Sequence, residues 1–361
     1  MKVLFVARAT LYKYKGGDTV QVLKTAACLQ KRGVDVDIKL TTDTIDYSRY
    51  DLLHFFNIIR PADILKHVTD SGKPYVVSTI FVDYSEYEQR ARTGLARLLF
   101  KFFSADQAEY LKVIARRIKN NEKIISPAYI WKGHTRSLKY IISEAARLLP
   151  NSASEYNRLA AHYHIQHAFS VIPNGIDTAL FKRTDTNQAR DNNLVICVGR
   201  IEGRKNQLNL IRALHGTGFR LYIIGSPSAN QAAYYAECRK SAGANVHFFD
   251  AVSQEELIKY YSTAKVHILP SWFETTGLST LEAAALGCNI VITDKGDTRE
   301  YFEDFAWYCD PASPESIRAA IEQAASSPVN RQLADKIYTH YTWDVTAEKT
   351  QQVYSEIVSK Q

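Results

Sequence analysis

The hydrophobic positions of the chain form short runs, and each run is followed by a longer stretch with helical spacing. Ten runs have the length and composition of β-strands. They cover residues 2–7, 34–40, 52–56, 75–79, 147–150, 194–199, 220–225, 246–249, 266–270 and 289–293. Strands that alternate with helices predict parallel sheets covered by helices on both faces. We therefore expect an α/β protein with two doubly wound halves.

The length also indicates two domains, because 361 residues exceed the usual size of one hydrophobic core. Residues 182–193 are polar and lack apolar periodicity. We place the domain boundary there, with an N-terminal domain over 1–182 and a C-terminal domain over 183–343. Residues 344–361 have helical spacing, and the pattern alone leaves open which domain this last helix packs on.

The net charge of +7 is concentrated in one region. Residues 86–140 contain twelve Lys and Arg against five Asp and Glu, so the rest of the chain is neutral. Apolar and aromatic patches interrupt the same region. This pattern is typical of a segment that binds an anionic membrane surface, and equally of a solvated helical hairpin. Nucleic acid ranks low, because zinc-finger spacing and RNP-like motifs are absent from the sequence.

Other bulk features point to a reduced, soluble protein. The first apolar run ends at Arg8 and is too short for a signal peptide, and no stretch is long enough to span a bilayer. We expect a cytoplasmic location. Residues 86–140 further suggest peripheral association with the inner face of the cell membrane. The five cysteines are scattered without a CxxC pair and are expected to be reduced packing residues.

Candidate anion sites follow the first strand of each half, since ligands of open parallel sheets bind beyond the carboxyl ends of strands. Gly16 and Gly17 precede an amphipathic helix, whose first amides attract an anion. Arg200 ends a strand, and Lys205 lies near the next helix start, where a diphosphate between the two cations is expected. Alternatively, Gly16 and Gly17 only turn the chain before the helix, and Arg200 and Lys205 are two solvated surface cations.

A third candidate site lies in residues 274–282. Ser279 and Glu282 have the spacing of a capping box, which explains Glu282 structurally. The box explains neither Glu274 nor Gly277, where the backbone would approach a ligand closely. The amides of Gly277, Leu278 and Ser279 at a helix start predict an anion site.

Two clusters that resemble metal sites have simpler explanations. Asp35 and Asp37 alternate with apolar residues and belong to the solvent face of a strand. His162, His164 and His167 have no carboxylate or thiolate at ligand spacing, and indicate a surface segment. We therefore expect no metal site.

Several motifs in order resemble the retaining GT-B glycosyltransferases of family 4. Residues 270–304 are similar to their signature segment, which contains a glutamate, a glycine and Leu-Glu-Ala. Residues 198–206 are similar to their Gly-Arg…Lys segment, and residues 171–177 to their interdomain Pro-Asn-Gly. Residues 16–36 are similar to their N-terminal glycine loop and helix, and residues 342–357 to their last helix. The resemblance covers nearly the whole chain except residues 86–140.

The resemblance implies a fold and an activity. The fold would be GT-B, with two Rossmann-like domains facing across a cleft and the helix of 344–361 crossing back to the N-terminal domain. The activity would be retaining transfer of a sugar from a nucleotide-diphosphate sugar to a hydroxyl of a glycan or lipid-linked acceptor. It would need no metal or other cofactor, and would serve bacterial surface polysaccharide or glycolipid synthesis.

The resemblance also implies roles for residues. Glu282 would hold the ribose, and Glu274 would lie by the transferred sugar. The diphosphate would bind the remaining candidates, which are Gly16, Gly17, Arg200, Lys205, Gly277, Leu278 and Ser279. Many members have a histidine beside the sugar where this chain has Phe81, so Asp83 is the candidate for the missing polar contact.

Phe81 also supports a different class of function, a nucleotide-sugar-binding protein without turnover. A GT-B epimerase that acts on the nucleotide sugar itself is a third hypothesis. A Rossmann dehydrogenase is disfavoured, because neither first-strand loop contains GxGxxG.

Overall fold

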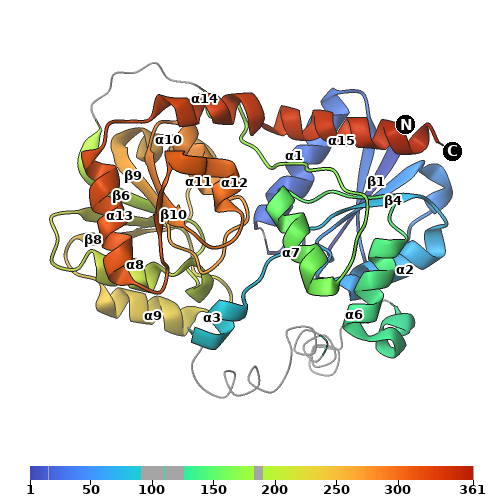
Figure 1. The fold of residues 1–361 in the computed structure, drawn as a ribbon, viewed down its shortest axis with the longest axis horizontal. Coiled ribbons are helices and arrows are strands. Elements are labelled where there is room, and N and C mark those ends of the chain that lie inside the picture. The colour runs from blue at the N-terminus through green and yellow to red at the C-terminus, as the bar shows by residue number, and fades with distance from the viewer. Residues whose placement is uncertain (15, 91–109, 111–125, 183–189, 361) are drawn as a thin grey trace. The chain divides into compact units, whose positions relative to one another are not determined.

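The computed structural model describes residues 1–14, 16–90, 110, 126–182 and 190–360 (Figure 1). Its contacts divide the chain into two compact units. Unit 1 comprises Met1–Phe81, Glu88–Asn174 and Trp343–Gln361, and unit 2 comprises Val82–Tyr87 and Gly175–Thr342. The sequence-based boundaries after residues 182 and 343 did not anticipate that Val82–Tyr87 groups with unit 2.

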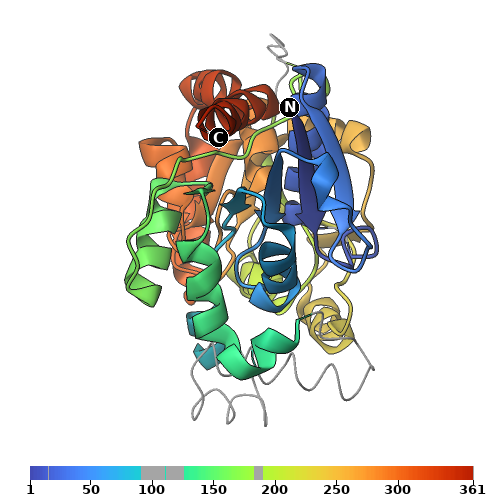
Figure 2. The same cartoon turned by 90° about the vertical axis from the view of Figure 1, so that its right-hand side faces the viewer.

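Unit 1 is built on a five-stranded parallel sheet in the order β2-β1-β3-β4-β5. Strands of this sheet are drawn as blue arrows in Figures 1 and 2. Its strands are β1 Lys2–Ala7, β2 Asp35–Leu40, β3 Leu52–Phe56, β4 Tyr75–Ser78 and β5 Arg147–Leu148. All five predicted strands are confirmed. β3 and β4 are buried along their whole length, because helices cover both faces of the sheet.

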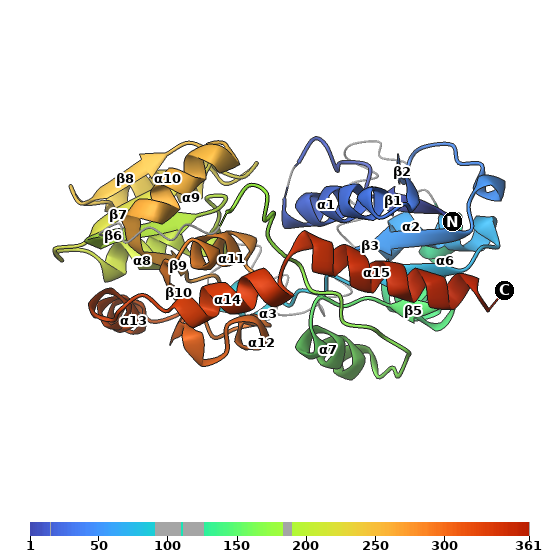
Figure 3. The same ribbon diagram turned by 90° about the horizontal axis from the view of Figure 1, so that it is seen from above.

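The helices of unit 1 are amphipathic and bury their apolar stripes on the sheet. They are α1 Gly17–Lys31, α2 Pro61–Ser71, α6 Pro127–Ser143, α7 Ala153–Tyr163 and α15 Trp343–Val358, with a 3-10 turn at Tyr47–Arg49. Gly33 follows α1 with φ +83, which a glycine adopts without strain. The last helix, α15, packs beside α1 (Figure 3).

Unit 2 contains a six-stranded parallel sheet in the order β11-β10-β9-β6-β7-β8. Its strands are β6 Asp191–Val198, β7 Arg220–Ile224, β8 Val246–Phe249, β9 Ala264–Leu269, β10 Asn289–Thr293 and β11 Trp307–Cys309. The five predicted strands are confirmed. The edge strand β11 was not predicted, because three residues are too few to show a period.

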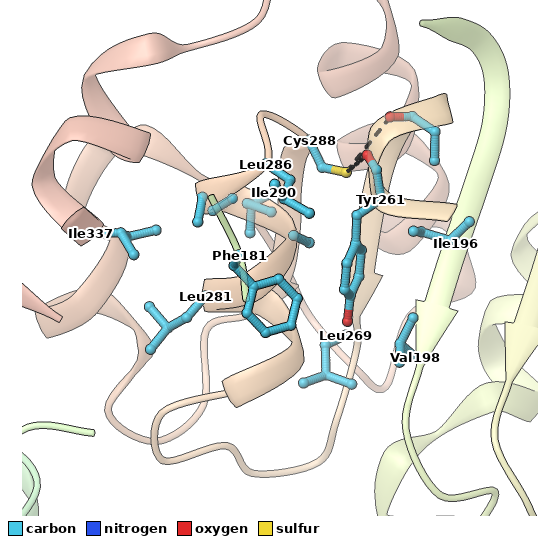
Figure 4. Packing of buried hydrophobic residues seen from close by; sticks show 14 of the residues in the cluster. Phe181, Ile196, Val198, Tyr261, Leu269, Leu281, Leu286, Cys288, Ile290 and Ile337 are labelled. Atoms are coloured by element: carbon cyan, nitrogen blue, oxygen red, sulfur yellow. Dashed lines mark hydrogen bonds between the residues drawn. The ribbon is translucent and has the colours of Figure 1, made fainter. Parts of the chain in front are cut away.

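Helices flank this sheet on both faces. They are α8 Gln207–Ala213, α9 Ala232–Ser241, α10 Gln254–Thr263, α11 Leu278–Ala285, α12 Thr298–Phe302, α13 Pro314–Ser326 and α14 Arg331–His340, with 3-10 turns at Gly203–Lys205 and Glu303–Phe305. Phe181, Tyr261 and Leu281 pack together in the core on one face (Figure 4). A second core cluster includes Val195, Leu210 and Ile317.

The two ends of the long segment of unit 2, Gly175–Thr342, lie against each other. The Ile176 amide donates to the Tyr341 carbonyl at 2.8 Å. A Cβ at Gly175 would overlap the backbone of Thr342, so a larger residue does not fit there.

The remaining predictions on the bulk features are resolved in part. All five cysteines are buried and free, as packing residues should be. None of the helices in the described part of the chain has the length and apolar character needed to cross a bilayer. Most of the basic region 86–140, and residues 183–189 of the expected linker, lie outside the described residues.

Candidate functional site

The central feature of the candidate site is an ion pair between Lys205 and Glu274. Lys205 follows β6 and Glu274 follows β9, and these two strands are neighbours in the sheet, so their carboxyl ends meet. Lys205 Nζ lies 2.6 Å from Glu274 Oε2, and the two side chains are only 22% and 11% exposed. Ser271 Oγ donates to the same carboxylate oxygen at 3.1 Å. The sheet therefore brings together two residues that the sequence separates widely.

The backbone of Glu274 is held by the loop after β10. Its amide donates to the Lys295 carbonyl at 3.1 Å, and its carbonyl accepts from the Asp297 amide at 2.9 Å. Gly296 lies between these partners with φ +100, and a Cβ there would overlap the Glu274 carbonyl. Glycine is thus required at residue 296 for Glu274 to keep its place.

Lys205 keeps its proton at neutral pH. Burial lowers the pKa of Lys205, but the charge of Glu274 and its hydrogen bond outweigh burial and raise the pKa above its ordinary value. The site therefore presents a cation at the carboxyl edge of the sheet.

The start of α11 lies against the end of β6. Gly277 is the N-cap residue with φ +67, a left-handed conformation that favours glycine. Ser279 is the second helical residue, and its hydroxyl donates to the Val198 carbonyl at 3.0 Å. The predicted capping box is therefore wrong: the helix begins one residue before Ser279, whose side chain bonds to β6 and not to the helix.

Glu282 is oriented by α10. Its Oε1 accepts from Gln254 Nε2 at 3.1 Å, and its Oε2 accepts from the Tyr261 hydroxyl at 3.2 Å. Burial raises the pKa of Tyr261 well above its ordinary value, and the charge of Glu282 raises it further, so the hydroxyl remains a donor. Neither partner was predicted, because the sequence pattern of α10 does not distinguish Gln254 and Tyr261 from ordinary helical residues.

Arg200 lies two residues beyond the end of β6. Its side chain is 52% exposed and pairs with Glu202 at 3.3 Å. Gln207 Nε2 donates to the Arg200 carbonyl at 2.9 Å and fixes the backbone there. Arg200 thus shares the sheet edge with Lys205 but has a different carboxylate partner.

The glycine loop belongs to unit 1. The sequence predicted that both glycines precede the helix; Gly16 is the N-cap of α1, and Gly17 is already its first residue. Arg8, which sequence analysis did not single out, organises this loop. It pairs with Asp18 at 2.6 Å and donates to the carbonyls of Thr10 and Tyr14.

Asp83 has a local role in the structure. It is exposed, and its Oδ1 accepts from the Ser85 amide at 2.9 Å at the start of α3 Ser85–Arg90. Its assignment as a catalytic residue stays a prediction. Phe81, in unit 1, is buried, and its amide donates to Glu155 Oε1 at 2.9 Å.

The clusters set aside as metal sites have other partners. Lys2 Nζ lies 3.2 Å from Asp35 and 3.3 Å from Asp37, and the Tyr50 hydroxyl donates to Asp37. His167 Nε2 bonds to the Ala145 carbonyl at 2.7 Å. Within the described ranges, no three His, Cys, Asp or Glu side chains are placed to hold a metal ion.

Known proteins are similar to this chain in sequence and in fold. Residues 180–339 match the family model described as Glycosyl transferases group 1. The D-inositol 3-phosphate glycosyltransferase of Acidothermus cellulolyticus is 27% identical over 249 residues, which cover 61% of this chain and 55% of that protein. The chain therefore spans about half the length of this curated relative.

Solved structures match the whole chain. Sucrose-phosphate synthase from Thermosynechococcus elongatus has a TM-score of 0.77 at 16% identity, with all of both chains covered. Anabaena HepE in complex with UDP has a TM-score of 0.68 at 13% identity and covers 99% of this chain and 100% of its own. Residues 180–339 thus match the group 1 glycosyl transferases, and the chain has the two-domain GT-B fold.

Proposed function

We propose that the protein is a retaining glycosyltransferase that moves a sugar from a nucleotide-diphosphate sugar to an acceptor hydroxyl. The single observation that carries this proposal is the Lys205–Glu274 pair beside the start of α11 at the carboxyl edge of a parallel sheet. The match of residues 180–339 to the group 1 glycosyl transferases and the UDP complex of HepE support a nucleotide donor.

In this proposal the cations of unit 2 bind the departing diphosphate. Negative charge grows on the diphosphate as the bond to the sugar breaks, and fixed positive groups lower the barrier at that moment. Lys205, Arg200 and the first amides of α11 supply such groups without a metal ion. Glu274 lies by the sugar and stabilises positive character at the anomeric carbon, and Glu282 holds the ribose.

The acceptor in this proposal is a glycan or lipid-linked hydroxyl, reached from the cytoplasmic face of the membrane. The excess of Lys and Arg in residues 86–140 supports attraction to an anionic surface. At the described end of this region, on α6, Trp131 is 87% exposed, and tryptophan favours membrane interfaces. Surface polysaccharide or glycolipid synthesis is the process that fits such an acceptor.

A donor screen tests the function. Thermal shift against UDP, GDP, ADP and CMP sugars should identify a stabilising ligand, since a ligand that binds only the native state raises the apparent melting temperature. Glu282→Ala should weaken binding of that nucleotide, and Glu274→Ala should mainly reduce turnover. Full transfer activity in both variants would refute the site.

Product analysis without acceptor separates a transferase from an epimerase, and absence of any turnover would favour a binding protein.

Vesicle sedimentation tests the membrane component. The protein should bind vesicles that contain anionic phospholipid more strongly than zwitterionic vesicles, and Trp131→Ser should reduce that binding. Phe169→Ser is the matched control, because Phe169 is 38% exposed and lies outside the basic region. Equal loss in both variants would contradict a specific role for Trp131.

A further inference from the structure

Lys205 and Glu274 neutralise each other before any ligand arrives. The contact between them is 2.6 Å, and neither side chain is more than 22% exposed. Ser271 supports the pair by donating to the same oxygen that Lys205 contacts. Both of these hydrogen bonds are made to Oε2 of Glu274. An incoming phosphate therefore meets a cation that is already engaged by a carboxylate.

Segment Val82–Tyr87 covers the loops that carry this pair. The ring of Tyr84 lies 4.1 Å from the Arg204 guanidinium carbon and 6.1 Å from the ring of Phe273. Arg204 directly precedes Lys205, and Phe273 directly precedes Glu274. The contacts of Tyr84 therefore flank both members of the pair, and reduced access of water strengthens the attraction between them.

Further contacts hold the segment and the two loops together. The ring of Tyr87 lies 6.4 Å from that of Trp272, and Glu86 pairs with Lys295 at 3.2 Å. The Trp272 amide donates to the Arg204 carbonyl at 2.9 Å and joins the loop of Lys205 to the loop of Glu274. Contacts among Val82–Tyr87, the loop of Lys205 and the loop of Glu274 thus keep the two side chains of the pair next to each other.

We propose that Glu274 competes with the donor's diphosphate for Lys205, so that the pair is an electrostatic latch that nucleotide binding opens. This inference rests on the proposed nucleotide-diphosphate donor. A diphosphate carries enough negative charge to draw Lys205 away from Glu274, whereas an uncharged nucleoside does not. Opening the latch releases Glu274 Oε2 toward the sugar only when the leaving group is in place.

Calorimetry with UDP, GDP and ADP tests the latch. Glu274→Gln keeps the backbone hydrogen bonds and removes the charge. It should bind the preferred diphosphate about tenfold more tightly, which is about 1.4 kcal/mol, while sugar transfer falls. Binding of the corresponding nucleoside should not change. Glu322→Gln is the matched control, because Glu322 pairs with Arg318 on the exposed face of α13 and should leave the affinity unaltered.

A second pair of variants isolates Lys205. In a Lys205→Met background, Glu274→Gln should no longer tighten diphosphate binding, because nothing remains to be released. Glu274→Asp keeps the charge but withdraws it by one methylene, and should give an intermediate affinity.

Unchanged or weaker diphosphate binding by folded Glu274→Gln, with normal binding by the wild type, would overturn the latch alone. Failure of the wild type to bind any of the three diphosphates would overturn the donor class, and the latch with it.

Discussion

His54 and Tyr354 are hydrogen-bonded across 300 residues of sequence. The Tyr354 hydroxyl on α15 lies 2.5 Å from His54 Nδ1 on β3, and Ser78 Oγ lies 2.8 Å from the other ring nitrogen. His54 and Tyr354 are both buried. The last helix is therefore joined to the sheet of unit 1 by a specific polar contact as well as by apolar packing.

Removing the Tyr354 hydroxyl should destabilise the protein. Tyr354→Phe leaves His54 Nδ1 buried without a partner, at an expected cost of about 1–3 kcal/mol. Urea unfolding measures the loss as a lower midpoint. Tyr14→Phe is the control, since Tyr14 is 49% exposed and should show no change. Equal midpoints for both variants would mean that the contact contributes nothing.

Stability should fall in acid because two histidines are buried in the neutral form. Burial lowers the pKa of His54 to about 3 and that of His267 to about 3, the latter with a smaller contribution from Lys205. Between the ordinary value near 6.5 and pH 3 the unfolded chain binds more protons than the folded chain. Each histidine should then cost about 1.4 kcal/mol per pH unit as pH falls through this window.

Leucine substitutions should separate the two histidines. His267 makes no hydrogen bond to the described residues through either ring nitrogen, so His267→Leu should flatten the acid slope with little loss at pH 7. His54→Leu should flatten the slope too, but should lose stability at pH 7, because Tyr354 and Ser78 lose a partner. Unfolding free energies at pH 4.5 and pH 7 decide this, and an unchanged acid slope in both variants would contradict it.

Gly296→Ala should impair the site more than the fold. The new Cβ would overlap the Glu274 carbonyl, and φ +100 is strained for alanine, so Glu274 must move. We expect loss of most sugar transfer, together with a lower melting temperature. Gly218→Ala is the matched control, since nothing lies within 4 Å of its Cβ position. Normal kinetics for Gly296→Ala would show that Glu274 tolerates displacement.

Arg190 should be important for the stability of unit 2. Its Nη1 donates to the Tyr261 carbonyl at 2.6 Å and to the Ala264 carbonyl at 2.7 Å, and Nη2 donates to the Leu286 carbonyl. Arg190→Met should cost about 1–3 kcal/mol for a carbonyl left buried without a donor. The Cys288 thiol also contacts the Tyr261 and Ala264 carbonyls and offsets part of that loss. Arg190→Lys should rescue little, because an ammonium group lacks the fork of the guanidinium. Exposed Arg212→Met should be neutral in the same thermal melts.

The order of strands and helices followed from the sequence because each depends on local pattern. Strands buried on both faces, such as β3 and β4, have continuous apolar runs, whereas β2 alternates apolar and polar residues. All ten predicted runs became strands. Gly33 marks the end of α1, because its left-handed φ of +83 is a local requirement that glycine meets without strain. The exception is β11, which has only three residues and gains its pairing from β10.

The partners of the candidate site were decided by tertiary structure. Lys205 meets Glu274 because β6 and β9 are neighbours in the sheet, and strand order cannot be deduced from hydrophobic period. Glu282 is held by Gln254 and Tyr261 because α10 packs beside α11. Tyr84 contacts Arg204 although the two residues are far apart in the sequence. The sequence alone determined which residues follow the carboxyl ends of the strands, since the position of each strand depends on local pattern. Only the packing of distant elements determined which of those residues touch.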